Sequence, residues 1–337
     1  MSLNTGAAGM AQTSKSRALW FPAAGTCELR DDTLPSMVDG EVRVRMLFSG
    51  ISRGTENLVF AGRVPSSEFD RMRGPHMGGE FPFPVKYGYS AVGQIEAGRA
   101  DLVGKAVFCL HPHQDFFNVS QAAVTVLPVG LPPARAVLAA NMETALNIVW
   151  DAGILPGDRV AVFGAGVVGS LVAYLASQII GTDVLLIDRN PARKVLADRL
   201  GLNFDAGQED AFEFDVAVNA SGSAEALARA IELAGQEARI VEASWYGDRP
   251  VSLLLGGAFH ARRLTIVSSQ VGSVPPARRA RWTYARRLAK ALELLRDDRL
   301  DALISGETGF ADLATAYPAI LADPQTLCHR ICYQYQT

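Results

Sequence analysis

The chain has 337 residues and a net charge of −3, with 49% hydrophobic and 20% charged residues. At about 150 residues per domain this length predicts two domains, and the hydrophobic content excludes wholesale disorder. The balanced charge argues against nucleic acid or an anionic membrane as a partner. The sequence contains no run of about 18 apolar residues, the length that a helix needs to span a bilayer. Four cysteines with no CxxC pair predict a reducing, cytoplasmic setting.

The pattern of apolar and polar residues changes once along the chain. Residues 1–16 are small and polar, and we treat them as a disordered leader or tag outside the fold. From residue 17 to 145, short alternating segments such as Glu41–Met46 predict a β-rich domain. From residue 146 to 297, apolar strands alternate with helices, which predicts a parallel sheet covered on both faces. Residues 278–296 are expected to form one long amphipathic helix near the end of this part.

A glycine-rich turn is the clearest motif. The apolar strand Val160–Phe163 runs directly into the GxGxxG sequence Gly164-Ala165-Gly166-Val167-Val168-Gly169, and apolar residues at helical spacing follow it. The first glycine permits a tight turn, the second lets the backbone approach a pyrophosphate, and the third allows close packing of helix on strand. The helix N-terminus adds free N–H groups and a positive dipole end. Together these features predict a dinucleotide site.

An acid near this loop points to the identity of the dinucleotide. Asp188 ends the next apolar strand, 19 residues after Gly169. A carboxylate there accepts hydrogen bonds from both adenosine-ribose hydroxyls and repels a 2′-phosphate, which favours NAD(H). Arg189 keeps NADP(H) as an alternative cofactor, because its guanidinium could pair with that phosphate. Ser221, in the loop after the strand Val216–Asn219, is expected either near the cofactor or as an ordinary turn residue.

The arrangement resembles the medium-chain dehydrogenase/reductase superfamily. The residues that carry the resemblance are Val42–Gly50, Gly54-Thr55-Glu56, Gly88–Gly93, Glu143-Thr144-Ala145, the glycine loop with Asp188, and the helix after Phe310. The sequence Ser52–Glu56 is further similar to the subgroup that includes bacteriochlorophyllide a dehydrogenase. The resemblance implies an α/β protein with a GroES-like catalytic domain over 17–145, a Rossmann domain over 146–297, and a C-terminal return over 298–337. It also implies that Thr144 lies beside the nicotinamide.

The zinc ligands of that superfamily are missing here. Counting forward from the Val-x-Val strand puts Ser52 at the position of the catalytic cysteine, and counting back from Gly54 puts Arg53 there. The histidine position holds Tyr89, and the third ligand position falls near Ala140. The four-cysteine structural lobe is absent as well. Because a catalytic zinc needs three protein ligands, we expect neither a catalytic nor a structural zinc.

Cys109, His111 and His113 offer a second metal hypothesis, because residues spaced by two share one face of a strand. Pro112 interrupts such a ladder and weakens this hypothesis. The favoured interpretation is that the strand stops near Leu110 and that the histidines sit on a loop toward the cleft. There they would titrate near neutrality and suit proton exchange.

Without zinc, side chains must handle the charge on a substrate oxygen. The resemblance puts Ser52, Arg53 and Tyr89 near the cleft. Tyr89 could donate a proton, or it could simply fill the volume of a lost metal site. Arg53 could hold an anionic substrate group or oxyanion, or it could form a salt bridge to Glu56 or another acid.

These residues favour a zinc-independent NAD(H)-dependent oxidoreductase that interconverts an alcohol and a carbonyl on a small molecule. The alternatives are an NAD(P)H-dependent enone or quinone reductase, which acts on a C=C bond, and a nucleotide-binding protein without turnover. The resemblance also implies a homodimer, in which an edge strand of the cofactor domain pairs across a two-fold axis. The apolar segment Leu264–Val267 is the candidate edge.

Overall fold

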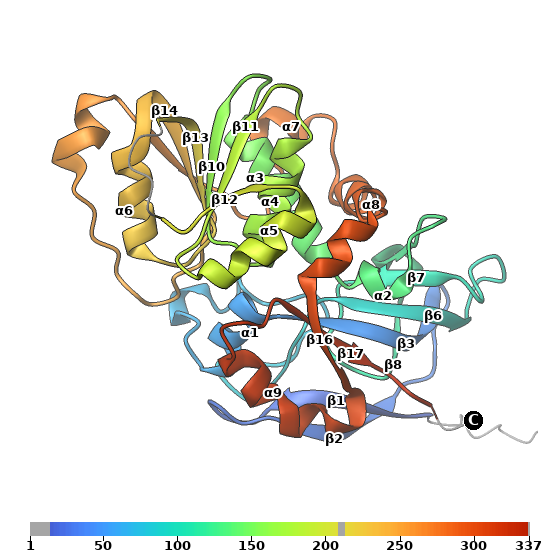
Figure 1. Cartoon of the computed structure of the whole chain (residues 1–337). Coiled ribbons are helices and arrows are strands. Elements are labelled where there is room, and N and C mark those ends of the chain that lie inside the picture. Colours follow the sequence, from blue (N-terminus) through green and yellow to red (C-terminus); the bar gives the residue numbers. More distant parts are fainter. Residues whose placement is uncertain (1–13, 208–212, 336–337) are drawn as a thin grey trace, which may run out of the picture.

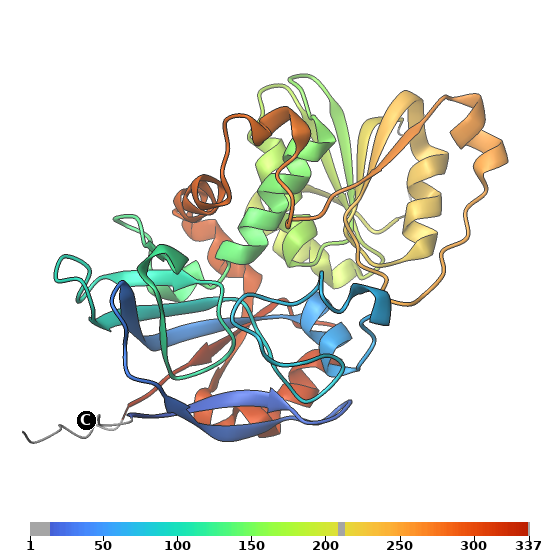
Figure 2. The same ribbon diagram turned by 180° about the vertical axis from the view of Figure 1, so that it is seen from behind.

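The computed structural model describes residues 14–207 and 213–335 and consists of two lobes, one above the other in Figures 1 and 2. The upper lobe is built on one parallel sheet. The lower lobe is built on a mixed sheet and a smaller antiparallel sheet. This combination confirms the predicted α/β class, with a β-rich domain joined to a Rossmann unit.

The upper sheet has the strand order β12-β11-β10-β13-β14-β15. Its strands are β10 (Arg159–Phe163), β11 (Asp183–Ile187), β12 (Asn203–Asp205), β13 (Phe214–Asn219), β14 (Ala234–Glu242) and β15 (Thr265–Ser268). The order reverses between β10 and β13. The carboxyl ends of those two strands therefore border the crevice where this kind of sheet binds ligands.

Helices cover both faces of this sheet, which explains its uninterrupted apolar strands. The upper-lobe helices are α3 (Ala139–Ala152), α4 (Val167–Ser177), α5 (Lys194–Leu200), α6 (Ala224–Leu233), α7 (Pro276–Arg279) and α8 (Tyr284–Leu294). In β10, Val160 and Val162 pack with α3, α4, α5 and α8. Ala161 and Phe163 point to the other face and pack with α6.

The lower lobe contains the larger sheet β16-β17-β3-β6-β7-β9, with β8 also paired to β3. Its strands are β3 (Glu41–Ser52), β6 (Ala91–Ala97), β7 (Ala106–Cys109), β8 (Phe116–Ser120), β9 (Val124–Val126), β16 (Ile304–Gly309) and β17 (Cys328–Cys332). The smaller sheet, β2-β1-β5-β4, contains β1 (Ser14–Phe21), β2 (Glu28–Leu34), β4 (Gly78–Gly79) and β5 (Val85–Lys86). The helices of this lobe are α1 (Arg53–Phe60), α2 (Pro133–Ala136) and α9 (Leu313–Ala322).

Short irregular turns connect these elements. The 3-10 turns are Ser66–Glu68, Gln121–Ala123, Pro191–Arg193, Asp298–Leu303 and Phe310–Asp312, and a π-turn spans Leu255–Phe259. Within the described part of the chain, no helix has the length and apolar character that a membrane span requires.

Three boundaries differ from the prediction. Residues 14–16, assigned to the leader, begin β1, and the Ser16 hydroxyl donates to the Asp115 carboxylate over 2.8 Å; residues 1–13 lie outside the described part. The domain boundary at 145/146 falls inside α3, which begins at Ala139 without a capping side chain. The helix expected over 278–296 is two helices, because the Thr283 hydroxyl accepts from the Arg286 N–H and starts α8 anew.

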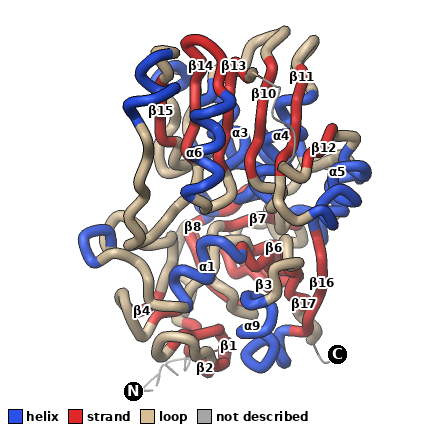
Figure 3. Tube along the Cα trace, turned by 60° about the vertical axis from the view of Figure 1, so that its left-hand side comes forward, coloured by secondary structure: helices blue, strands red, loops and turns tan. Residues whose placement is uncertain are grey.

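Contacts of the loops that follow β11 and β14 place the carboxyl ends of these strands toward the lower lobe, which lies below the upper sheet in Figure 3. Arg193, between β11 and α5, donates to the Pro324 carbonyl over 2.8 Å. Gly247, in the loop after β14, lies so close to Arg63 that a Cβ there would be 3.0 Å from the Arg63 carbonyl oxygen. The two lobes therefore meet at the strand ends, where this kind of sheet binds ligands.

Candidate active site

The glycine loop leaves room for a ligand at one position and none at the other two. Gly164 has a φ of +103°, and a Cβ there would come within 2.8 Å of Ser221 Cα. A Cβ at Gly169 would lie 1.9 Å from the Gly164 carbonyl oxygen. At Gly166, directly before α4, a Cβ would meet nothing within 4 Å. The backbone is thus open where a pyrophosphate would approach the first N–H groups of α4, including those of Val167 and Val168.

Asp188 follows β11 and is fixed against this loop. One carboxylate oxygen accepts from the Ala165 N–H at 2.7 Å, and the other accepts from the Asn190 N–H at 2.9 Å. The neighbouring Arg189 is exposed. These contacts hold an acceptor beside the glycine loop, where an adenosine ribose would lie, so the residues present fit a nicotinamide dinucleotide.

A buried cation, Arg193, lies at the cofactor end and was not predicted from the sequence. The Arg193 side chain is bound to carbonyl oxygens of Pro324 and Gln325. Burial lowers the pKa of Arg193, the Asp188 charge raises it, and the charge of Arg53 lowers it. Arg53, from the lower lobe, thus lies near the cofactor end. No sequence motif marks Arg193, because the contacts that place it come from residues more than 130 positions away.

Ser221 belongs to a network across the ends of β13 and β14. Its hydroxyl donates to Asn219 Oδ1 over 2.6 Å, and Asn219 Nδ2 donates to the Glu242 carboxylate over 2.7 Å. The Tyr246 hydroxyl donates to the same carboxylate over 3.1 Å. Since the Ser221 backbone packs against Gly164, this network supports the rear of the glycine loop.

At the other end of the crevice, polar side chains from β3, α3 and the loop before β6 come together. Asn141 Nδ2 donates to the Ser52 hydroxyl over 3.3 Å, and the Ser52 and Thr55 side chains lie close enough to the Tyr89 phenol to lower its pKa. Tyr89 also packs against the hydrophobic clusters of both lobes. Thr144, on α3, is half-buried, and its hydroxyl donates to the Ala140 carbonyl over 2.9 Å. Ser52 and Tyr89 therefore do meet.

The Tyr89 phenol keeps its proton in the neutral range. Burial raises its pKa most strongly, the charge of Glu56 raises it further, and the hydrogen bonds to Ser52 and Thr55 lower it only in part. A phenol in this state is a hydrogen-bond donor rather than an anionic base.

The two candidate histidines lie inside the lower lobe rather than on the crevice. The His113 side chain is 0% exposed, with Nε2 3.0 Å from the Glu56 carboxylate and Nδ1 2.8 Å from the Ser49 hydroxyl. The His111 ring is stacked on Phe117 at 3.7 Å, and burial lowers its pKa well below the usual value. Neither ring faces a substrate in this structure. The salt bridge considered between Arg53 and Glu56 is replaced by the contact with His113.

The donor set near Ser52 does not match that of a zinc site. Ser52, Arg53 and Tyr89 supply no thiolate, imidazole or carboxylate, which are the usual zinc ligands. Burial raises the pKa of the Cys109 thiol to about 12. Over residues 14–207 and 213–335, no group of three His, Cys, Asp or Glu side chains is arranged to hold a metal ion. The absence of zinc remains a prediction.

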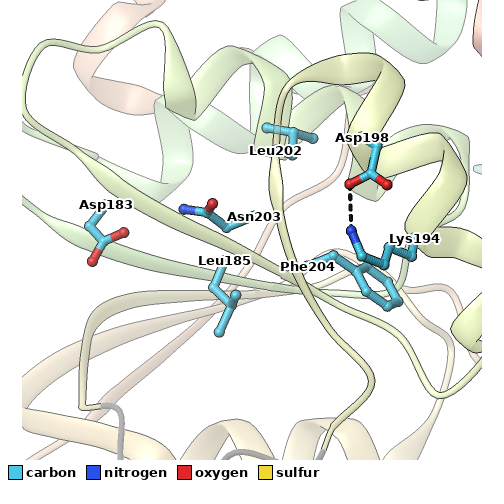
Figure 4. Close-up of a pocket in the computed structure, with 7 residues that line it drawn as sticks. All are labelled: Asp183, Leu185, Lys194, Asp198, Leu202, Asn203 and Phe204. Atoms are coloured by element: carbon cyan, nitrogen blue, oxygen red, sulfur yellow. Dashed lines mark hydrogen bonds and ion pairs between the residues drawn. The ribbon is translucent and has the colours of Figure 1, made fainter.

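A surface hollow of about 420 Å³ lies elsewhere on the upper lobe (Figure 4). It is lined by Asp183, Leu185, Lys194, Asp198, Leu202, Asn203 and Phe204. Asp183 begins β11, whereas Asp188 follows its end, so the hollow is at the opposite end of the strand from the glycine loop. The Lys194–Asp198 ion pair of 2.7 Å across one helical turn accounts for its polar side, and we assign it no part in the reaction.

Comparisons with known proteins agree with this geometry. No protein-family model matches the chain. D-guloside 3-dehydrogenase of Escherichia coli K12 is 25% identical over 313 residues, which cover 84% of this chain and 89% of the relative. 2-Dehydro-3-deoxy-L-galactonate 5-dehydrogenase of Pseudoalteromonas atlantica is 24% identical over 225 residues, 63% of this chain and 62% of that protein.

A solved structure shows the same fold with a cofactor in place. The short chain alcohol dehydrogenase of E. coli CFT073, crystallised with NADH, matches with a TM-score of 0.76 at 17% identity over 96% of this chain and 100% of that one. Together these likenesses support an NAD(P)-dependent oxidoreductase. The named relatives are dehydrogenases with alcohol and sugar-derived substrates, and the match extends over both lobes of this chain.

Proposed function

We propose that this oxidoreductase interconverts an alcohol and a carbonyl on a polyhydroxylated small molecule, with NAD(H) as cofactor and without a catalytic zinc. The main support is the polar group formed by Ser52, Asn141 and Tyr89, which borders the same crevice as the glycine loop. The relatives named above act, by their names, on sugar-derived compounds, which favours a substrate rich in hydroxyl groups.

In the proposed mechanism the upper lobe holds the dinucleotide. The backbone at Gly166 and the first turn of α4 receive the pyrophosphate, while Asp188 accepts from the adenosine ribose. When bound, the nicotinamide ring supplies the hydride chemistry. Thr144 would lie beside that ring, on the helix that also carries Asn141.

The lower lobe handles the charge on the substrate oxygen. In the reducing direction, the protonated Tyr89 phenol donates a hydrogen bond to that oxygen as negative charge develops on it. A low-dielectric site strengthens this interaction. Tyr89 then gives its proton to the oxygen and regains one from solvent. In the oxidising direction Tyr89 acts as a relay, because the phenol passes its own proton to solvent as it takes the proton of the alcohol.

Two measurements test the proposed function. Tryptophan fluorescence should report tighter binding of NADH than of NADPH. Turnover should then be followed by nicotinamide absorbance with polyols, aldonates, glycosides, simple alcohols and enones. We expect oxidation of a polyol or sugar-derived alcohol in chelator-treated protein. Loss of activity on chelation, with recovery on adding zinc, would contradict the metal-free mechanism.

A second function, reduction of an activated C=C bond, is favoured by one observation. The two histidines that could serve as near-neutral acids are buried away from the crevice, and Tyr89 has a raised pKa. A reaction that needs only hydride delivery and protonation by solvent would tolerate such a site. Turnover of enones, with no reaction of any alcohol or ketone in the panel, would select this function.

A further inference from the structure

A buried carboxylate lies directly beneath the substrate end of the crevice. Glu56, in the first turn of α1, is 0% exposed. Its Oε1 accepts from the Ser52 backbone N–H over 2.8 Å. Its Oε2 is 3.0 Å from His113 Nε2 and accepts from the Tyr317 hydroxyl over 2.6 Å. Three partners therefore converge on one side chain that no solvent reaches.

The hydrogen bonds behind Glu56 allow one assignment of donors in which all of them run in a single direction. Tyr333 lies 2.9 Å from the Ser49 hydroxyl, which lies 2.8 Å from His113 Nδ1. If Tyr333 donates to Ser49, Ser49 donates to His113 Nδ1 and His113 Nε2 donates to Glu56, then each proton has an acceptor. Burial raises the pKa of Tyr333 and of Tyr317 well above the usual value, so both phenols keep the protons that they donate.

This assignment makes His113 neutral and Glu56 an anion held by three donors. A buried charge is tolerated when hydrogen bonds satisfy it in this way. The opposite assignment, with His113 donating from Nδ1 to Ser49, would leave one proton without an acceptor among these contacts. That proton is the one of Ser49 if Tyr333 also donates to Ser49, and the one of Tyr333 if Ser49 donates to Tyr333. The arrangement thus has one well-satisfied pattern.

The partners of Glu56 come from distant parts of the lower lobe. Ser49 and Ser52 lie at the end of β3, and His113 follows β7. Tyr317 is on α9, and Tyr333 follows β17. The network therefore attaches the turn from β3 into α1 to the C-terminal part of the chain. That turn carries Ser52, which in turn contacts Asn141 and Tyr89.

We propose that Glu56 and His113 form a positioning pair that holds Ser52, and through it Tyr89, in place against α3 for the reaction. This inference rests on the proposed function, because it assigns the pair to the same substrate end. Neither residue touches the substrate. A displacement of about 1 Å at the reacting groups can cost a hundredfold in rate, so loss of the pair should reduce kcat by about that factor.

The first arm of the test is kinetic. Glu56→Gln replaces an acceptor by an amide facing two donors, whereas Glu56→Asp keeps the charge on a shorter side chain. We expect kcat to fall about 10²-fold in Glu56→Gln, with partial recovery in Glu56→Asp and no change in NADH affinity. Tyr317→Phe should show a smaller loss, because it removes one of three donors and keeps the core volume.

A matched control separates positioning from stability. Asp301→Asn removes the charge and one of the two acceptor oxygens of a pair with the buried Arg135, in which each bond is 2.7 Å. It should lower the melting temperature while leaving kcat unchanged. In a double-mutant cycle, Glu56→Gln should add little to the loss already caused by Tyr89→Phe, because it acts through that residue. Losses that multiply would overturn the inference.

The second arm does not depend on turnover. Crystal structures of wild-type protein and Glu56→Gln should differ at the Ser52–Asn141 contact and at the Tyr89 ring, with the remaining lower lobe unchanged. Ser52 and Tyr89 in their wild-type positions would overturn the positioning role, whatever the activity. Wild-type protein that turns over no member of the substrate panel would instead refute the proposed function alone.

Discussion

At the cofactor end of the crevice the functional atoms belong mostly to the backbone, whereas at the substrate end they belong to side chains held by other side chains. Gly164 and Gly169 are packed against backbone, and Gly166 exposes it. Ser52 instead donates its N–H to the carboxylate of Glu56, which is itself in contact with an imidazole and a phenol. A backbone site tolerates few substitutions and offers little variation. A side-chain site can change its chemistry one residue at a time.

The largest effect should come from adding one methyl group to the glycine loop. Gly169→Ala would place a Cβ 1.9 Å from the Gly164 oxygen. We expect it to abolish NADH binding and to lower the free energy of unfolding by about 3 kcal/mol. Gly166→Ala is the matched change, because its Cβ would meet no protein atom. It should abolish NADH binding while the free energy of unfolding stays within about 1 kcal/mol of the wild-type value. Fluorescence titration and urea unfolding check both, and equal stabilities would contradict the packing argument.

The next effect isolates the substrate end. Tyr89→Phe should lower kcat about 10²-fold, because it removes a donor to the developing oxyanion. The Kd for NADH should not change. Because the pKa of Tyr89 is raised, its phenol stays protonated through the neutral range, and its removal should not shift the pH profile there. Tyr87→Phe, a buried neighbour in the lower-lobe core, serves as the control and should turn over normally.

A smaller change should follow at the ribose. Asp188→Ser should weaken NADH binding about tenfold by removing a charged hydrogen-bond acceptor, and it should relatively favour NADPH. Arg189 and Arg193 would then provide the nearby positive charge. Asp183→Ser, at the other end of β11, should leave both affinities unchanged. Wild-type protein that prefers NADPH would show that Asp188 does not set the cofactor preference.

The smallest effect on catalysis should come from disrupting the proposed dimer. β15 is an edge strand, which pairs with β14 alone among the strands of residues 14–207 and 213–335, and Ile266 is half-buried there. We propose that two copies pair through this edge, and Ile266→Lys should shift sedimentation from dimer to monomer. Turnover should persist, because each chain carries both ends of its own crevice. A wild-type monomer at micromolar concentration would contradict the proposed assembly.

The glycine loop and Asp188 were predictable because their signal is local. Six consecutive residues and one strand end define the site, and strand alternation placed the elements around it. The burial of His113 was not predictable in this way, because its partner Glu56 is 57 positions away. Tyr317 is 261 positions from the same carboxylate. No period or spacing in the sequence reports such a contact.

The bounds of the helices and strands show the same limit, because only bounds that a local pattern marks could be predicted. Apolar strands such as β10 and β11 were located within a residue, because both of their faces are buried. The start of α3 was missed, since Leu138 precedes it without a capping side chain. The split between α7 and α8 depends on Thr283, a single cap inside a continuous amphipathic pattern.

The place of β17 has a consequence for synthesis on the ribosome. This strand, made of residues 328–332, lies between β16 and β3, and β3 was made almost 300 residues earlier. The upper lobe has all its strands once residue 268 has emerged, and it can collapse on local contacts. The lower lobe must wait for the last residues of the chain, with the edge of β3 unpaired meanwhile. During synthesis the nascent chain should therefore acquire a dinucleotide-binding unit before it acquires a completed substrate site.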